Sequence, residues 1–455
     1  MDHDTGATLL FDLEGVAVSR VYRDADGMRV VELVTTDETA TACPSCGSFS
    51  SRSKERVVTR PRDLPHGGSP VDIRWVKRRW ECREVRCERG TFTEQVSQIP
   101  ARARLTGRLR EACGQAVVDG GRTVIQAGRD LGVSWPVVMQ ATRDHAEQVL
   151  PATLPTTEAI GIDEIRRGRA VWRELPDGKW ELVADPWHIG FVDATGGQGL
   201  FGQVEGRTSA SVQKWLAEQP GHWRHSVRYA VIDLCPTFRA AIKAAARTVL
   251  PGVELIVDCF HLVQLANRKL ADVRRRLAWK QYGRRARKGD AAWTVKGLLR
   301  RNEEDLSTEQ LTIMKRELNQ MGTYGRQILS AWQAKELLRD LLRLTYKHAH
   351  TAPDRSAISA ARFRFQDFCA TRSYLPELVT LAETVDEWWD GIENYIKTGI
   401  SNAASEGNNR LIKLDARNAF GYRNRANQRL RSRCATTRRA RREGVPGQLR
   451  RPVLV

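Results

Sequence analysis

Residues 227–261 constrain the fold of this chain most, because they contain two apolar runs that each end on an acidic residue. The first run, 227–232, is followed by Asp233, and the second ends on Asp258 with His261 close behind. A helical pattern joins the two runs, so the stretch is predicted to form a parallel strand-helix-strand unit. Open α/β sheets place their chemistry at the carboxyl ends of such strands, where these two acids would lie.

Further strands are predicted upstream of this unit. Residues 159–163 read as a buried strand that ends on Asp163, and residues 187–192 and 199–204 flank a glycine turn as an antiparallel pair. The first strand of such a meander can lie at the centre of a mixed sheet, beside the strand that precedes Asp233. Asp163 and Asp233 are therefore expected side by side at one edge of the sheet.

Two carboxylates that lie so close are unfavourable unless a cation neutralises them. Oxygen ligands of this kind suit Mg²⁺ or Mn²⁺. Two such ions about 3.5–4 Å apart can activate an attacking oxygen and stabilise a leaving one. The pair of acids therefore predicts a divalent-metal site.

A third acid, Glu406, lies on a predicted helix that Ser401 or Asn402 can cap. Amide and basic residues recur on this helix at steps of three and four residues, so that they share a face with Glu406. They are Asn409, Arg410 and Lys413, which we expect to bind DNA. A carboxylate set among such groups makes chemical sense beside a phosphodiester.

Other polar residues near these acids have simpler explanations. Any single acid at a strand end is more often a surface carboxylate. Glu164 should point to the opposite side of the strand from Asp163, and Asp193 should form a turn. Asp258 and His261 can support the site or assist in metal binding, but a purely structural role is at least as common.

The charge of the chain points to a polyanionic partner. Lys and Arg total 73 against 54 Asp and Glu, a formal charge of +19, which favours nucleic acid before an anionic membrane. No apolar run reaches the roughly 18 residues that a membrane span needs. The first residues lack the basic and apolar regions of a signal peptide, so a cytoplasmic, nucleoid-associated protein is expected.

Two cysteine pairs, Cys43 with Cys46 and Cys82 with Cys87, are separated by about 35 residues. Such pairs supply four thiolates to a structural zinc ion. The alternatives are cysteines without metal, or a zinc site in which His66 replaces one of them. The arginine-rich ribbon around these pairs is expected to face either DNA or solvent.

Residues 123–138 have the pattern of a helix-turn-helix, with small Ala127 at the helix crossing and Gly132 in the turn. Ser134 as cap and Pro136 in the first turn would start the second helix. The residues expected near a major groove are Ser134, Trp135, Gln140 and Arg143. Turn glycines also occur in ordinary helical hairpins, which is the alternative.

The pattern after His261 is helical for well over a hundred residues, and it contains Trp332, Trp388 and Trp389, which are expected in the core. The last segment is rich in arginine. It is expected to be a flexible tail that contacts a DNA backbone or is simply solvated.

Taken in order, these motifs resemble the DDE transposases of the insertion-sequence family called IS-L-three, over roughly residues 43–430. The resemblance rests on Gly161-Ile-Asp163-Glu164, Val231-Ile-Asp233-Leu-Cys-Pro236, Asp258-Cys-Phe-His261 and Ser401-Asn…Glu406-Gly-Asn-Asn. It implies that Asp163, Asp233 and Glu406 are the metal-binding triad, and that Asp258 and His261 form the family's DxxH element. One departure is Leu234-Cys235, where the family commonly has Met-Ser.

The expected fold class is α+β and multidomain, because the resemblance implies a ribonuclease-H-like catalytic domain with an all-helical insertion. The expected parts are a zinc ribbon (1–100), a helix-turn-helix (101–150), the catalytic domain (156–261 and 399–430), the insertion (262–398) and a basic tail (431–455).

The expected function is a transposase that binds the terminal inverted repeats of an insertion sequence and catalyses Mg²⁺-dependent DNA cleavage and strand transfer. Joining two ends makes a homodimer on double-stranded DNA the natural assembly. One alternative is a DNA-binding regulator of the same fold, which would bind but never cleave. Another is a structure-selective nuclease, which would cut without terminal repeats.

Overall fold

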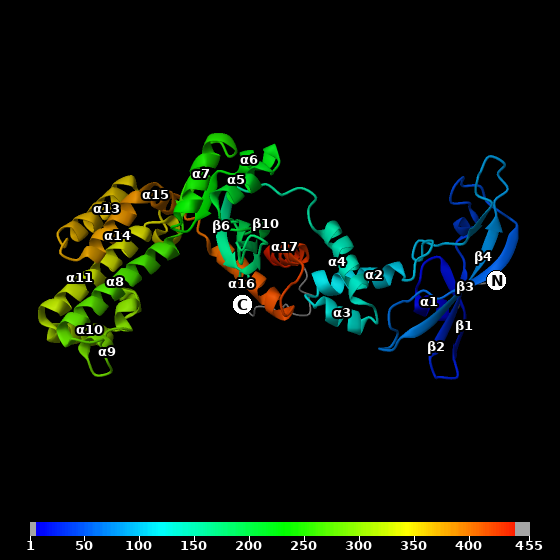
Figure 1. Ribbon diagram of the computed structural model, residues 1–455, viewed down its shortest axis with the longest axis horizontal. Helices are drawn as coiled ribbons and strands as arrows, with labels where there is room; N and C mark the ends of the chain where they lie inside the picture. Colours follow the sequence, from blue (N-terminus) through cyan, green and yellow to red (C-terminus); the bar gives the residue numbers. More distant parts are fainter. Residues whose placement is uncertain (1–5, 442–455) are drawn as a thin grey trace. The chain divides into compact units, whose positions relative to one another are not determined.

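A computed structural model describes residues 6–441 of the chain (Figure 1). These residues form two compact units. Among these residues, the first unit comprises 6–152 and 415–438, and the second comprises 153–414 and 439–441. None of the helices within residues 6–441 combines the length and the hydropathy that a membrane-spanning helix needs.

The first unit begins with a five-stranded sheet of order β1-β2-β4-β3, with β5 paired to β4. Its elements are α1 (Gly6–Phe11), β1 (Val16–Arg23), β2 (Arg29–Thr35), η1 (Glu38–Thr41), β3 (Ser53–Thr59), β4 (Val71–Glu81) and β5 (Thr91–Thr93). Leu33, Ile73 and Trp75 are fully buried in its core. The cysteine pairs follow η1 and β4, so paired strands hold both in place.

Three helices follow: α2 (Gly107–Val118), α3 (Val124–Asp130) and α4 (Trp135–Val149). Thr123 caps α3 through a capping box with Gln126. Ala127 is fully buried, and Gly132 has a left-handed φ of 66° in the turn, both as predicted. Ser134 occupies the cap position of α4, but the predicted capping hydrogen bond from its side chain is absent.

The prediction of a flexible tail is wrong for residues 431–441, because α17 (Arg425–Arg441) is a helix that belongs largely to the first unit. Ser432 and Cys434 are buried, and Cys434 packs against Val118 and Ala146 of α2 and α4. Small residues therefore give this basic helix a face that packs. Residues 442–455 of the predicted tail lie outside the described residues.

A buried ion pair joins α17 to Asp415, whose carboxylate accepts a hydrogen bond of 2.8 Å from Arg431. Arg431→Ala would leave Asp415 buried with only the hydroxyl of Tyr422 as donor. We therefore expect a loss of about 3–5 kcal/mol in local stability. Hydrogen exchange should show weaker protection of α17 and α2.

The control is Arg417→Ala, because Arg417 is exposed and should change stability by no more than about 0.5 kcal/mol. Equal protection of α17 from hydrogen exchange in both variants would contradict its packing against α2 and α4.

The second unit contains a five-stranded mixed sheet of order β10-β9-β6-β11-β12. Its strands are β6 (Ala159–Arg166), β9 (Trp187–Asp193), β10 (Leu200–Glu205), β11 (Tyr229–Ile232) and β12 (Glu254–Val257). The strands β6, β11 and β12 run parallel to one another, whereas β9 is antiparallel to β6 and β10. As predicted, β6 lies at the centre beside β11.

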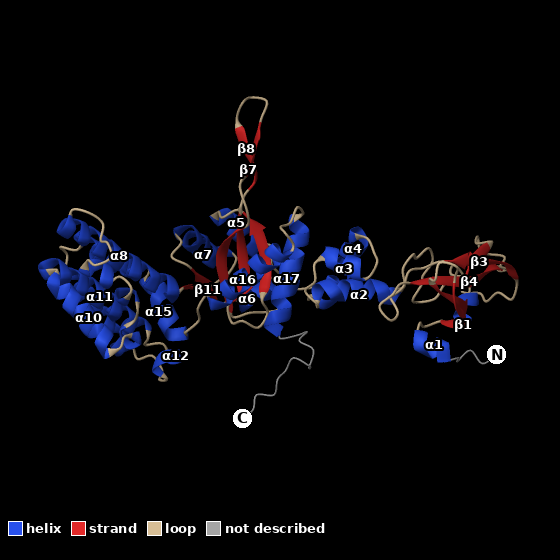
Figure 2. Cartoon of the chain, turned by 90° about the horizontal axis from the view of Figure 1, so that it is seen from below, coloured by secondary structure: helices blue, strands red, loops and turns tan. Residues whose placement is uncertain are grey.

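Two further strands, β7 (Val171–Glu174) and β8 (Trp180–Ala184), form a separate hairpin that projects from this unit (Figure 2). Three helices, α5 (Ser209–Ala217), α6 (Gly221–Ser226) and α7 (Pro236–Thr248), pack on the sheet. Pro236 in the first turn starts α7 just after Asp233, as predicted. The short helix α6 was not predicted, although its Trp223 is fully buried.

Helices fill the stretch between β12 and α16 (Ala403–Asn418). They are α8 (Cys259–Tyr282), α9 (Ala291–Thr294), η2 (Leu298–Arg300), η3 (Glu303–Asp305), α10 (Thr308–Gln320), α11 (Gly322–Leu342), α12 (Tyr346–Ala349), α13 (Arg355–Ala370), α14 (Pro376–Glu387) and α15 (Trp389–Thr398). Trp332 and Trp388 are buried as predicted, whereas Trp389 is only half-buried, against the guanidinium of Arg362.

The helix α15 covers the edge strand β12. A Cβ atom on Gly391 would lie 2.7 Å from Cγ2 of Val257, so the helix backbone approaches the strand closely. The amide of Asn394 donates a hydrogen bond of 3.0 Å to the carbonyl of Leu255. This contact protects a strand edge and fixes where the chain returns to the sheet.

Candidate active site and cysteine cluster

Asp163 and Asp233 lie on neighbouring strands at the same edge of the second sheet. Ile162 pairs with Ile232 in the parallel ladder between β6 and β11. Asp163 is the next residue on β6, and Asp233 directly follows the end of β11. Burial raises the pKa of Asp163. Burial, and then the charge of Asp163, raise the pKa of Asp233 to about 7. The predicted juxtaposition of these two carboxylates is therefore present.

Asp258 and His261 lie beside Asp233 at the start of α8. The Nε2 atom of His261 is 3.2 Å from Oδ2 of Asp233 and 3.9 Å from Oδ2 of Asp258. Ligand atoms of these three residues all lie within 4.8 Å of one another. The side chain of Asp258 also caps α8 by accepting a hydrogen bond from the backbone N–H of Phe260. Asp258 is thus both a helix cap and part of the acidic cluster.

The helix α16 reaches the two acids because Gly161 leaves room for it. A Cβ atom at residue 161 would lie 2.5 Å from Oγ of Ser405 and 2.8 Å from Oδ1 of Asn402. With this approach, the amide of Asn409 donates a hydrogen bond of 2.5 Å to Asp163. The amide of Asn402 donates one of 3.4 Å to Asp233.

Glu406 lies between these two amides on the helix. Its backbone N–H donates to the carbonyl of Asn402, and Asn409 follows three residues later, so all three residues share a face. Burial raises the pKa of Asp258, and the charge of Glu406 adds to this effect. Glu406 therefore faces the acidic edge, although its ligand oxygens are not in the tight cluster with His261.

The donor set fits a hard divalent cation. Asp258 is buried, and Asp163 and Asp233 are partly buried. Among the described residues, the ion pairs of these three aspartates involve only the imidazole of His261, and no lysine or arginine. Several buried carboxylates without a full countercharge are unfavourable, and a bound cation would neutralise them. Oxygen ligands with one imidazole suit such an ion.

The remaining residues predicted at the site have other surroundings. Glu164 is half-buried on the strand next to Asp163. Asp193 accepts hydrogen bonds from Gly197 and Gln198, which confirms its predicted place in a turn. Arg410 and Lys413 are exposed on α16, and Arg410 lies 3.7 Å from Glu406. The contact of Asn402 with Asp233 was not predicted from the sequence, which indicated only a helix cap.

The residues predicted to read DNA lie on α4 in the first unit. Trp135 is 46% exposed at the start of the helix. Gln140 is exposed and donates to Asp144, while the guanidinium of Arg143 donates to Gln140 and to Asn427. Trp135 and Gln140 thus have accessible side chains, whereas Arg143 is held by neighbours.

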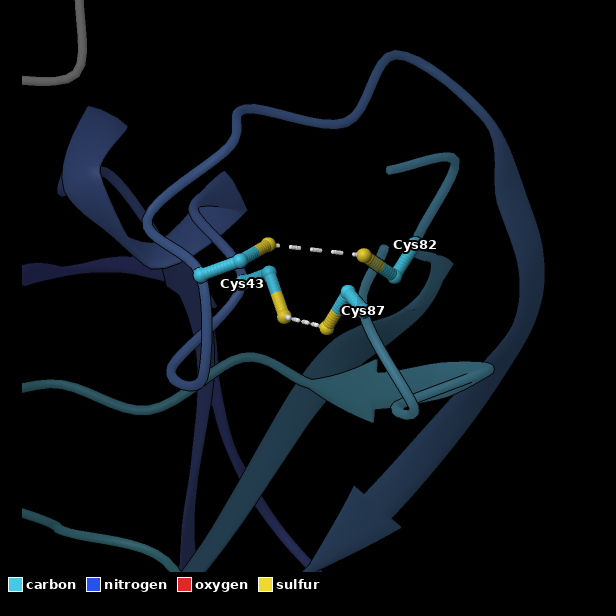
Figure 3. Close-up of side chains that lie close together, drawn as sticks. Cys43, Cys82 and Cys87 are labelled. Carbon is cyan, nitrogen blue, oxygen red and sulfur yellow. Dashed lines mark hydrogen bonds between the residues drawn. The ribbon is translucent and has the colours of Figure 1, made fainter. Parts of the chain in front are cut away.

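The four predicted cysteines converge in the first unit (Figure 3). Their sulfurs lie within 4.8 Å of one another, with Cys43 3.9 Å from Cys87 and Cys46 3.7 Å from Cys82. Four thiolates around zinc at about 2.3 Å would be about 3.8 Å apart, so the cluster fits the ion. His66 instead stacks on Phe11, outside the cluster.

The approach of α16 to β6 can be tested by adding one methyl group. Gly161→Ala should push α16 away from Asp163 and lower any metal-dependent activity by about 10²-fold. Gly190→Ala is the matched control on the neighbouring strand, because its Cβ would meet nothing closer than 3.7 Å. Equal activity of the two variants would contradict a role for this close approach.

The cysteine cluster predicts about one zinc ion per chain. Cys87→Ser should lower the zinc content measured by mass spectrometry and destabilise the sheet of the first unit, because the metal links its two cysteine-bearing loops. Cys113→Ala, which changes a buried cysteine outside the cluster, should keep its zinc. A full zinc content in Cys87→Ser would exclude the four-thiolate site.

Two family models match the chain, and they agree with the resemblance found in its motifs. The transposase model of the ISL3 DDE family covers residues 160–432, and the model for the zinc-finger of transposases IS204/IS1001/IS1096/IS1165 covers residues 39–87. The transposase for insertion sequence element IS1001 of Bordetella parapertussis is 24% identical over 419 residues, covering 90% of this chain and 92% of the relative. The chain therefore belongs to the ISL3 family of DDE transposases, which are metal-dependent polynucleotidyl transferases.

Proposed function

We propose that this transposase binds the terminal inverted repeats of an insertion sequence and catalyses Mg²⁺-dependent cleavage and strand transfer at Asp163, Asp233 and Glu406. The observation that carries the proposal is the meeting of two adjacent strand ends and one helix face at a single acidic edge. The strand order, in which the first strand of the sheet lies between the second and the fourth, supports a ribonuclease-H-like fold. Mn²⁺ can substitute for Mg²⁺ with the same ligands.

Each residue around the acids has a positioning task. When bound, the divalent ions activate the attacking oxygen and stabilise the leaving oxygen of the phosphodiester. Asn409 orients Asp163, while Asn402 and His261 orient Asp233. The exposed Arg410 and Lys413 on α16 are suited to hold the phosphates on either side of the reacting one. Asp258 fixes the start of α8 and so the place of His261.

In the first unit, we propose that α3 and α4 form a helix-turn-helix and that α4 enters the major groove of the repeat. The exposed side chains of Trp135 and Gln140 are suited to contact base edges, and that of Ser134 to contact the backbone. Arg143 would first have to leave Gln140 and Asn427 to contact the DNA. Structural zinc at the four cysteines holds the ribbon. We propose the domain limits predicted from the sequence, except near the end of the described residues, where 415–438 belong to the first compact unit and 431–441 to α17.

The assembly that we propose is a homodimer on double-stranded DNA, because strand transfer joins two ends to one target. Its proposed location is the prokaryotic cytoplasm at the nucleoid, where that DNA lies.

Glu406→Gln tests the proposal, because it removes one charge from the metal site and leaves the helix intact. Losing a ligand that stabilises transition-state charge should slow Mg²⁺-dependent nicking by about 10²–10³-fold, while binding to the repeats stays unchanged. Glu164→Gln is the matched control, since Glu164 lies on the same strand as Asp163 but outside the proposed triad. Nicking and binding are measured on the DNA that flanks the reading frame.

Three results would contradict the proposal. Undiminished nicking by Glu406→Gln would remove this residue from the site. Binding without cleavage by the wild-type chain, with any divalent ion, would indicate a regulator. Equal cleavage of DNA that lacks inverted repeats would indicate a structure-selective nuclease.

A further inference from the structure

A groove of about 410 Å³ lies on the helical insertion, between α8 and the segment that contains η2. Ten residues line it, and none of them is acidic. The cationic ones, which we call the basic groove, are Arg268, Arg274, Arg275, Lys296 and Arg300. This concentration of one charge in a concave surface focuses a positive potential.

Four of the five cations of the basic groove have no carboxylate partner among the described residues. Arg268 and Arg300 are exposed and form no ion pair, and Lys296 contacts only the ring of Trp293, at 5.0 Å from its centroid. Arg274 is half-buried, donates only to the carbonyl of Ala292, and its pKa is lowered by burial. Only Arg275 is paired, with Asp272.

Several other arginines of the insertion form ion pairs, unlike four of the five cations of the basic groove. Examples are Arg276 with Glu377 at 2.7 Å, Arg284 with Asp290 at 2.6 Å and Arg362 with Asp386 at 2.5 Å. An excess of unpaired cations costs stability through repulsion. An anionic ligand that binds in the groove would offset this repulsion.

One helix connects the basic groove to the acidic edge. Asp258 caps α8, and Arg268 and Arg275 follow on the same helix, about 15 Å and 26 Å along its axis at a rise of about 1.5 Å per residue. A duplex advances about 3.4 Å per base pair, so these distances correspond to roughly four to eight base pairs. A duplex whose phosphate lies at the acids can therefore reach the groove within one helical turn.

We propose that the basic groove binds the phosphodiester backbone of the duplex that occupies the active site. The inference rests on the proposed function and adds to it a second anchoring surface, in the insertion rather than in the zinc ribbon or the helix-turn-helix. Because the ligand is the backbone, the contact is independent of sequence. It would hold the duplex on the acidic edge while leaving the reading of bases to α4.

The test measures how the affinity of the full-length chain for a 40-bp duplex of random sequence depends on salt. Fluorescence anisotropy is recorded from about 50 to about 200 mM KCl, without added divalent metal. The groove variant combines Arg268→Gln, Lys296→Gln and Arg300→Gln. The control combines Lys315→Gln, Arg316→Gln and Arg326→Gln, which removes the same charge from exposed positions on α10 and α11. Arg268→Lys with Arg300→Lys keeps the charge of the groove.

Each lost phosphate contact should reduce the magnitude of the slope of log affinity against log salt by about 0.9. The slope of the groove variant should therefore be smaller than that of the wild type by about 2.7. Across this fourfold salt range, the wild-type affinity should then fall about 40-fold more than that of the groove variant. The slope of the control variant should fall by less than about 1, and the lysine variant should keep the wild-type slope. All variants should keep the wild-type circular dichroism spectrum.

Equal slopes for the groove variant and the control would overturn the proposal. A lysine variant whose slope falls as far as that of the groove variant would also overturn it. A groove that binds an acidic protein instead of DNA would give the first of these results. Failure of the proposed function is seen separately, because the groove variant retains Glu406 and the nicking assay does not depend on the slope. A wild-type chain that binds no duplex would overturn both.

Discussion

The contact between α16 and β6 at Gly161 is the constraint on which the candidate site depends. Without a side chain at this position, Ser405 and Asn402 approach the strand backbone closely. The amides of Asn402 and Asn409 then reach the two aspartates, with Glu406 between them on the same face. The helical insertion supports this arrangement from the other side, because α15 packs on β12 and so returns the chain to the sheet just before α16 begins.

The electrostatics of the three aspartates explain why they are suited to bind a cation together. Burial raises the pKa of each of the three aspartates, and their mutual repulsion adds to this for Asp233. Such a cluster is costly for a protein without a cation, and it is suited to a protein that binds one. Amide donors orient the carboxylates without neutralising them, which leaves their charge available for a metal. Much of the positive charge lies on exposed surfaces such as the basic groove, which suit the DNA backbone.

Much of the second sheet, of the candidate site and of the cysteine cluster was predictable from the sequence. Apolar runs that end on Asp163 and Asp233 predicted parallel neighbours, because strand burial and chain reversal are encoded locally. The spacing of the cysteines predicted their convergence, because each close cysteine pair is a local signal in the sequence. The contact of Asn402 with Asp233 joins residues 169 positions apart and has no local signal. The packing of α17 was not predicted, because its many arginines indicate an exposed segment. Small residues on one face of the helix, such as Ser432, are nevertheless buried.

The proposed function depends on where a divalent ion binds. The most direct measurement is anomalous diffraction at the manganese edge from crystals of the full chain soaked in Mn²⁺. If these three acids form the metal site, manganese will lie between the carboxylates of Asp163 and Asp233, with Glu406 contributing an oxygen. Manganese held by Asp258 and His261 alone, with Glu406 turned to solvent, would contradict it.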